Sequence, residues 1–543
     1  MKVLYDCSSG VPPSPANPLS HGSHPFRKPS ADVVFASSDN VVFRVHRIIL
    51  AEASDFFELM FSLPQPVAQP SIPEKKRGSR KHIEQQELDG LPLLRVTETS
   101  AVLENLFRLC YPVQDPALTD LDAITDTLEA AIKYDMREAT QILQERLTAL
   151  VHTDPLRLYA IACRHSLEDV AAAAAAEVVR QELEVRYIDA MVHITAGTYY
   201  RLAFYAHAKG KVSAFFAFCR PSFARADDDA RRGQREEFEA GFKFPPPDAM
   251  IRGADAEYGV HSAIVCQTSS VLKDLFRHAS SQQSSIRPES ACCADKDSPN
   301  AYGAPKLAVD LPEDRRSLAT LLRLCYDQDT DHLHIDEIAS ALTLATKYRL
   351  PNITRRLADA LRASARGDPV RVYLIASHFG LASLAQHAAR LTLGVPIEPQ
   401  YYPQLEDVSA RVYDALLQYR RACGEAAEAT LDDLSWLPHD TPPTFSNHSA
   451  GCFRAHTCKT GTRFFPCWFI AFLRHLGDAL VKKPLASTAT SVEWLAAALS
   501  DPAVKFCSRC ERSLGVTEFG QVSGFLAGAI DRAVSQVELL AHD

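Results

Sequence analysis

The sequence contains one long pattern twice, and this repeat constrains the fold more than any other feature. The string RLCY occurs at Arg108–Tyr111 and again at Arg323–Tyr326, at an offset of 215 residues. Further matches lie at offsets of 214 or 215 residues, namely Val45-His46 with Val260-His261, Lys133-Tyr134 with Lys347-Tyr348, Asp154-Pro155 with Asp368-Pro369, Ile194-Thr195-Ala196 with Val408-Ser409-Ala410, and Tyr199 and Tyr205 with Tyr413 and Tyr419. Solenoid repeats are only about 20–50 residues long. The chain is therefore predicted to carry two copies of a domain-sized unit, at about 30–220 and 246–436.

Each copy predicts a hairpin followed by helices. In the first copy, the apolar stretches 32–36 and 41–45 flank the turn residues 37–40. Ser54 is expected to cap a helix. A third strand at 93–96 leads into the RLCY helix, whose apolar residues recur at helical spacing, and the sequence then reads as helical to about residue 220.

These residues resemble the BTB/POZ domain, over 30–135 in the first copy. The matching signature residues are Asp32, His46, Ser54, Phe57, Met60 and Tyr111. The second copy, over 246–350, is similar to a degenerate BTB/POZ domain and keeps Asp248, His261, Ser269, Phe276 and Tyr326. The tandem arrangement resembles BTB-domain proteins of basidiomycete fungi. The resemblance implies a small sheet covered by helices in each copy.

The function implied by this resemblance is protein–protein association. BTB/POZ domains commonly form dimers, so we expect an interaction surface near the first helix, at Val45, Ile49, Leu50 and Phe56, with part of this set belonging to the core. Two copies in one chain have a high effective concentration for each other, which favours pairing within the chain. The leading hypothesis is a non-enzymatic interaction scaffold. The alternatives are a substrate adaptor of a cullin-type ubiquitin ligase and a transcriptional or chromatin regulator.

The polar signature residues favour a structural role over catalysis. Asp32 and His46 are expected to form a hydrogen-bonded pair at the edge of the core, while the resemblance alternatively implies a charged pocket at a dimer groove. A cullin adaptor of this family carries an apolar-x-Glu motif before the third strand. The segment 83–90 lacks a clear copy, and Val96-Thr97-Glu98 fits only at the strand end. The sequence contains neither H-E-x-x-H nor G-x-S-x-G, so an enzyme is not expected.

The region after Trp436 has a different composition and a cluster of cysteines. A Cys-x-x-Cys turn at Cys507 and Cys510 is typical of half of a tetrahedral zinc site. The other half could come from two of Cys452, His456 and Cys458. Thiols without metal are the alternative. Apart from this structural zinc, no cofactor is expected.

Length, charge and cysteine usage limit the remaining classes. The 543 residues are too many for one domain. The net charge of −9 argues against nucleic-acid binding along the whole surface, although the basic run 75–81 could be a nuclear import signal. The longest strongly apolar run, 464–473, is too short for a membrane span of about 20 residues. We expect an intracellular protein of the cytoplasm or nucleus whose 14 cysteines are mostly reduced.

The predicted fold class is α+β, with two BTB/POZ-like units, each followed by an α-helical region, and a mostly helical C-terminal module. The predicted divisions are a disordered lead (1–29), BTB/POZ domain 1 (30–135), helical extension 1 (136–225), degenerate BTB/POZ domain 2 (246–350), helical extension 2 (351–436) and a Cys/His-containing module (445–543).

Overall fold

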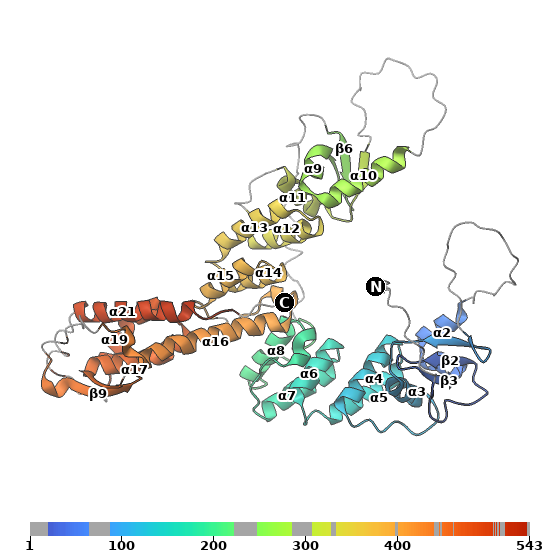
Figure 1. The fold of residues 1–543 in the computed structure, drawn as a ribbon, viewed down its shortest axis with the longest axis horizontal. Helices are drawn as coiled ribbons and strands as arrows, with labels where there is room; N and C mark the ends of the chain where they lie inside the picture. Colours follow the sequence, from blue (N-terminus) through green and yellow to red (C-terminus); the bar gives the residue numbers. More distant parts are fainter. Residues whose placement is uncertain are drawn as a thin grey trace, which may run out of the picture. The chain divides into compact units, whose positions relative to one another are not determined.

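A computed structural model of the chain describes residues 20–63, 87–221, 247–284, 307–326, 333–396, 400–438, 445, 448–459, 461–502, 504, 507, 510 and 516–539 (Figure 1). It divides into two compact units. One comprises Met1–Ala190 and Tyr205–Arg220, and the other comprises Met191–Phe204 and Pro221–Asp543. The expected basic run 75–81 and most of both insertions lie outside the described residues.

The first repeat opens with the expected hairpin, which lies at the centre of a five-stranded sheet. The strands are β1 (Ser20–His21), β2 (Val33–Ala36), β3 (Val41–Val45), β4 (Glu87–Leu88) and β5 (Leu91–Arg95), in the order β1-β3-β2-β5-β4. Strand β2 is antiparallel to β3 and parallel to β5. Asn40 adopts a φ of 63° in the turn, a conformation that asparagine tolerates better than most residues.

Helices form the rest of the first repeat. They are α1 (Arg47–Ala53), α2 (Asp55–Ser62), α3 (Ser100–Cys110), α4 (Leu121–Lys133), α5 (Arg137–Ala149), α6 (Pro155–Arg164), α7 (Glu168–Arg180), the 3-10 helix η1 (Asp189–His193) and α8 (Ala196–His207). Several begin at a residue whose side chain accepts a backbone N–H, as Asp154 does before Pro155 at the start of α6. Phe35 and Phe107 pack edge to face at 5.4 Å between the sheet and α3.

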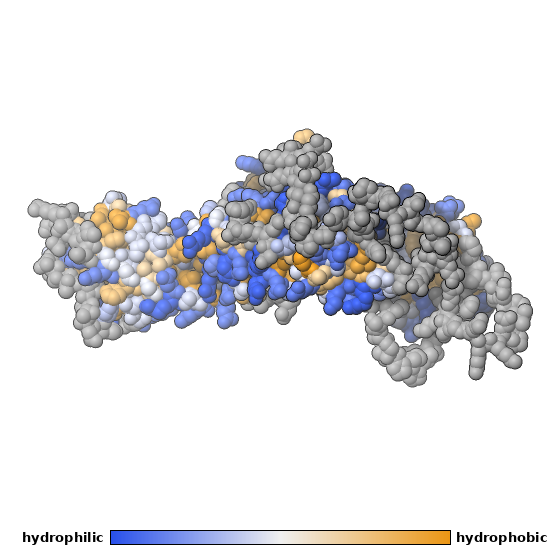
Figure 2. Space-filling model, turned by 90° about the horizontal axis from the view of Figure 1, so that it is seen from above, coloured by the Kyte–Doolittle hydropathy of each residue, from blue (hydrophilic) through white to orange (hydrophobic). Residues whose placement is uncertain are grey.

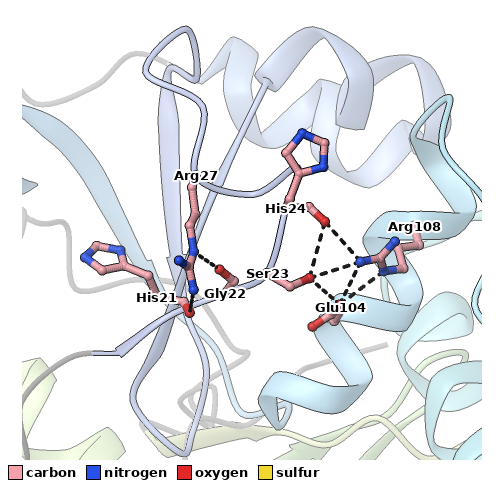
Figure 3. Close-up of polar contacts among 7 residues, drawn as sticks. All are labelled: His21, Gly22, Ser23, His24, Arg27, Glu104 and Arg108. Carbon is pink, nitrogen blue, oxygen red and sulfur yellow. Dashed lines mark hydrogen bonds and ion pairs between the residues drawn. The ribbon is translucent and has the colours of Figure 1, made fainter.

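The structure corrects the expected disordered lead, because residues 20–29 belong to the fold. Strand β1 pairs in parallel with β3, and Phe26 is fully buried against Phe107 and Tyr111. Figure 3 shows Ser23 next to α3, where its hydroxyl donates to Glu104 at 2.5 Å and accepts from Arg108 at 3.0 Å. The buried phenyl ring and these polar contacts fix the segment, which its Pro-, Ser- and His-rich composition did not indicate.

The second repeat has the same order of elements. It contains β6 (Ala249–Arg252), β7 (Glu257–Val260), α9 (Ser262–Thr268), α10 (Ser270–Ser284), β8 (Leu307–Asp310), α11 (Arg315–Cys325), α12 (Ile335–Lys347), α13 (Pro351–Ser364), α14 (Pro369–His378), α15 (Ala382–Thr392), the 3-10 helix η2 (Pro403–Glu406) and α16 (Ala410–Asp432). Its described sheet has the order β7-β6-β8, with β6 parallel to β8, as β2 is to β5. The repeated sequence therefore gives a repeated topology.

The C-terminal module packs on α16 and contains a hairpin that the expected mostly helical fold did not include. Its elements are η3 (Leu434–Trp436), η4 (Ala450–Cys452), β9 (Phe453–Cys458), β10 (Gly461–Pro466), α17 (Cys467–Lys482), α18 (Ala486–Ala489), α19 (Val492–Leu499) and α21 (Val516–Ser535). Trp468, Phe472, Leu526 and Ile530 are fully buried in its core. Gly424 of α16 lies so close to Val481 that a Cβ atom at this position would come within 2.6 Å of the Val481 backbone oxygen. Among the described residues, no helix has the length and apolar character needed to cross a membrane.

Candidate functional site

The signature residues Asp32, His46 and Tyr111 form hydrogen bonds at the start of α1. The Tyr111 hydroxyl accepts the backbone N–H of His46 at 2.8 Å and lies 3.1 Å from Nδ1 of the same residue. The Asp32 carboxylate accepts the backbone N–H of Arg47 at 2.8 Å. These contacts join the end of β3, the start of α1 and the end of α3, so they position backbone rather than a substrate.

The second repeat reproduces these contacts. The Tyr326 hydroxyl accepts the backbone N–H of His261 at 2.7 Å and lies 2.8 Å from its Nδ1. The Asp248 carboxylate accepts both the N–H and the hydroxyl of Ser262, at 2.7 and 2.6 Å. The residues that match between the two repeats at an offset of about 215 therefore make the same hydrogen bonds, in addition to lying at the same positions of their helices.

Ser54 and Ser269 are buried helix caps. Ser54 Oγ accepts the N–H of Phe57 at 3.1 Å and donates to the Tyr134 carbonyl at 2.5 Å. Ser269 makes the same pair of contacts with Leu272 and Tyr348, at 3.0 and 2.6 Å. Each hydroxyl thus caps one helix and ties it to the end of another. Phe57 and Phe276 are buried beside these caps, and Met60 is half-buried.

A buried carboxylate in each repeat was missed in the sequence analysis. Glu98 accepts from Lys133 at 2.5 Å and from the Tyr134 hydroxyl at 2.6 Å. Burial alone raises the pKa of Glu98, but these two donors lower it below its ordinary value. Glu313 has the equivalent contacts with Lys347 and Tyr348. The repeated Lys-Tyr pair was the available signal. Because Glu98 is hydrogen-bonded inside the domain, the apolar-x-Glu match at Val96-Thr97-Glu98 is explained by a structural contact.

The expected interaction surface is only partly exposed. Val45 and Leu50 are fully buried, so they are core residues, because β3 and α1 direct these side chains towards the sheet–helix interior. Ile49 is half-buried, and Phe56 is 44% exposed. Two residues that were not anticipated, Ile48 and Leu59, are 71% and 66% exposed. Helices α1 and α2 thus each carry large exposed apolar side chains. Elsewhere on the described surface, hydrophobic residues lie among hydrophilic ones (Figure 2).

The C-terminal module brings together one histidine and three cysteines. Nδ1 of His448 lies 3.7 Å from the sulfur of Cys452, 3.5 Å from that of Cys507 and 3.4 Å from that of Cys510. The Cys510 sulfur is 3.5 Å from Cys452 and 3.6 Å from Cys507. All four ligand atoms lie within 4.8 Å of one another, so this group could hold a metal ion.

These separations can be compared with the edges of a zinc-centred tetrahedron. With Zn–S bonds of about 2.3 Å and Zn–N bonds of about 2.0–2.1 Å, tetrahedral geometry puts sulfurs about 3.8 Å apart and sulfur and nitrogen about 3.6 Å apart. The distances around His448 and Cys510 fall close to these values. The donor set is therefore arranged as tetrahedral ligands would be.

The ring nitrogen of His448 that faces away from the sulfurs contacts a carboxylate. His448 is fully buried, and its Nε2 lies 3.3 Å from an oxygen of Glu518 on α21, which is itself 9% exposed. A carboxylate can only accept, so this contact favours the proton on Nε2 and leaves the lone pair of Nδ1 facing the three sulfurs. Glu518 is therefore positioned like the carboxylates that accept a hydrogen bond from the second ring nitrogen of metal-ligating histidines.

The thiols of the cluster have opposed proton affinities. Burial alone raises the pKa of Cys507, but the backbone N–H of Cys510 and hydrogen bonds with the Cys452 and Cys510 thiols contribute to lowering it to about 5. Burial is the largest effect on Cys452 and raises its pKa to about 11. A lowered pKa favours the thiolate form that a metal requires.

His448, and not His456, accompanies the three expected cysteines. His456 lies in β9, which begins directly after Cys452, and an extended chain advances about 3.3 Å per residue. Four residues of strand carry His456 away from Cys452, and its ring packs against Phe465 instead. The backbone of Cys458 lies at the far end of the same strand.

A fifth cysteine borders the cluster. The sulfur of Cys467, at the start of α17, lies 3.2 Å from Cys452 and 3.7 Å from Cys510. It does not belong to the group of four mutually close ligand atoms found among the described residues.

Comparison with known proteins identifies the family of the first repeat. The model of the BTB/POZ domain matches residues 24–150. A search of curated proteins found no similar protein. BTB/POZ domains are generally interaction modules that mediate protein–protein contacts and self-association. Strands β2–β5, helices α1–α5 and the Tyr111–His46 contact all lie within the matched residues. The chain therefore contains a BTB/POZ domain at residues 24–150.

Proposed function

We propose that the protein is a non-enzymatic interaction scaffold built on two BTB-like units that pair within the chain. The observation that carries the proposal is the BTB/POZ domain at 24–150, whose helices α1 and α2 expose Ile48, Phe56 and Leu59. Large exposed apolar side chains on two consecutive helices are a feature that protein-binding surfaces use. We place association with partner proteins on this face.

The second repeat is proposed to be a degenerate BTB/POZ domain. Its support is the same order of elements, the same sheet connections and the same Tyr326–His261 and Ser269–Tyr348 hydrogen bonds as in the first repeat. Its apolar residues Ile264 and Leu275, on α9 and α10, are each 36% exposed. The weaker exposure is consistent with a less open binding surface than that of the first repeat.

The experiment for the scaffold is affinity purification of the full chain from its native cells, followed by mass spectrometry. The variant is Ile48→Asp with Leu59→Asp, which places two charges on the proposed face. The matched control is Val492→Asp, because Val492 is 66% exposed but lies on α19 of the C-terminal module. We expect the double variant to lose partners that the control retains. Retention of the same partners by both would refute the proposal.

We further propose that His448, Cys452, Cys507 and Cys510 hold a structural zinc ion. Three cysteines and one histidine are a common donor set of closed structural zinc sites. The support is the near-tetrahedral spacing of the four atoms and the Glu518 contact behind His448. Metal analysis of the purified chain should find one zinc ion per chain, and Cys467→Ser should leave this content unchanged. A metal-free protein would refute the proposal.

A further inference from the structure

Equivalent segments of the two repeats are hydrogen-bonded to each other inside the second compact unit. Thr195 and Ser409 form an antiparallel bridge. On either side of it, the N–H of Ala196 donates to Val408 at 2.8 Å, and the N–H of Ala410 donates to Ile194 at 3.0 Å. The paired segments 194–196 and 408–410 are the ones that match at an offset of 214 residues.

The side chains next to this bridge are also equivalent. The rings of Tyr199 and Tyr413, which match at the same offset, meet at 6.3 Å and 73°. Both are buried. A surface that pairs with its own equivalent has the pattern of a two-fold interface between identical subunits. By backbone and tyrosines alone, two first repeats from different chains could pair as well as the first and second repeats of one chain.

One ion pair between a buried arginine and a half-buried glutamate breaks this symmetry. Glu406 of η2 binds Arg201 of α8 and accepts from Thr195 at 2.9 Å and from the Tyr401 hydroxyl at 2.7 Å. The Arg201 side chain is 5% exposed. Gly197 makes room for this carboxylate, because a Cβ atom at this position would overlap it.

The equivalent positions lack the carboxylate, the guanidinium and the glycine of this contact, although Tyr187 and Ser409 match Tyr401 and Thr195. At an offset of 214, Val192 occupies the position of Glu406, and Ala415 that of Arg201. Position 411 is arginine where the first repeat has Gly197. The interface therefore contains the Glu406 carboxylate from the second repeat and a site for it, Arg201 and Gly197, from the first.

Pairing of like repeats would consequently be unfavourable. Two first repeats would set Val192 against Arg201, leaving a buried guanidinium without a carboxylate. Two second repeats would set Glu406 against Ala415. The side chain of Arg411 would then occupy the space that Gly197 leaves open for the carboxylate. Removing one partner of a buried ion pair is strongly destabilising. Specificity of this kind comes from the cost of the wrong pair as much as from the contacts of the right one.

We propose that Arg201, Gly197 and Glu406 restrict this surface to pairing between the first and second repeats of the same chain. The inference rests on the proposed pairing of the two units within the chain and names the residues that select it. Because both segments belong to one chain, each has a high local concentration for the other. The charge pair excludes a second copy of the chain.

The first experiment captures the bridge as a disulfide in the full chain. Thr195 and Ser409 face each other without exchanging backbone hydrogen bonds, so their Cα atoms are expected about 4.5 Å apart, within disulfide range. Thr195→Cys with Ser409→Cys should give a bond between positions 195 and 409 of one chain, identified by peptide mapping under mild oxidation. A bond between two chains at these positions would overturn the inference.

The second experiment moves the carboxylate from one repeat to the other. In a chain carrying Thr195→Cys alone, no covalent dimer through position 195 is expected. Adding Val192→Glu and Glu406→Ala makes the first repeat complementary to itself, and the dimer should increase at least tenfold. The matched control is Glu425→Ala on the same background, because Glu425 is an exposed residue of α16. Circular dichroism checks that each variant is folded.

The outcomes separate this inference from the proposed function. A folded carboxylate-transfer variant that stays monomeric, or an unmodified interface that dimerises equally through position 195, would overturn the selection by charge. Partner binding through α1 and α2 is read separately from Ile48→Asp with Leu59→Asp. The disulfide result can be interpreted whether partner binding is lost or retained, because the two tests change different residues.

Discussion

Replacing His448 by alanine should abolish metal binding at this site and lower the thermal stability of the C-terminal module. His448 supplies the one nitrogen of the four-atom group and is fully buried, so no solvent-exposed side chain can take its place without rearrangement. Its loss would also leave the Glu518 carboxylate without this partner. The perturbation therefore acts on the ion and on the contact between the cluster and α21.

The magnitude follows from the loop that the metal closes. Cys452 and Cys507 are 55 positions apart, and the ion would join them. The chain-entropy treatment of a cross-link of this span gives about 4 kcal/mol of stabilisation at 25 °C. For a module of this size, that corresponds to a fall in the melting temperature on the order of 15–30 °C.

The assay combines metal content with thermal unfolding of the purified full chain. His448→Ala should lose zinc and show the lower transition, and chelation of the unmodified protein should have the same effect. His456→Ala is the matched control, because this histidine lies nearby in β9 but outside the group of four. Equal zinc content in the two variants, or an unfolding transition insensitive to chelation, would refute the assigned ligand set.

Three further predictions concern the BTB/POZ domain. Tyr111→Phe should destabilise it by about 1–3 kcal/mol in urea unfolding, because a backbone N–H loses its acceptor. Ser54→Ala should cost about 1–2 kcal/mol in the same assay, as a buried cap is removed. Hydrogen bonds from Lys133 and Tyr134 lower the pKa of Glu98 despite burial, so its contribution to stability is present above the unfolded-state pKa of about 4.3 and is lost as the pH falls below that value. Glu98→Gln should weaken this acid dependence in pH-resolved unfolding, and an unchanged profile would contradict it.

Much of the fold could be predicted because the relevant signals are local and occur twice. Two apolar stretches on either side of turn residues predicted β2 and β3, Ser54 predicted the start of α2, and the RLCY stripe predicted the buried face of α3. Residues 20–29 were mispredicted because a single buried ring, Phe26, holds a segment whose composition is otherwise typical of disorder. The hairpin β9–β10 was missed because its polar strands carry little apolar alternation.

The candidate site shows the same division. Cys507 and Cys510 were predicted as ligands, because a Cys-x-x-Cys turn brings two thiols together whatever the rest of the fold. His448 was not among the candidates, because which histidine reaches the cysteines depends on where strand β9 begins. Spacing favoured His456, but β9 extends the chain away from Cys452 at that point.

The sequence by itself determined that one long pattern occurs twice, that its first occurrence resembles a BTB/POZ domain, and which residue types recur at the constant offset. These are properties of order along the chain and of local periodicity. Only the tertiary structure decided that His448 completes the cysteine cluster, that Val45 and Leu50 are core while Ile48 and Leu59 are exposed, and that Glu406 meets Arg201 from the other repeat. Each of these depends on residues that folding brings together over distances that no local pattern encodes.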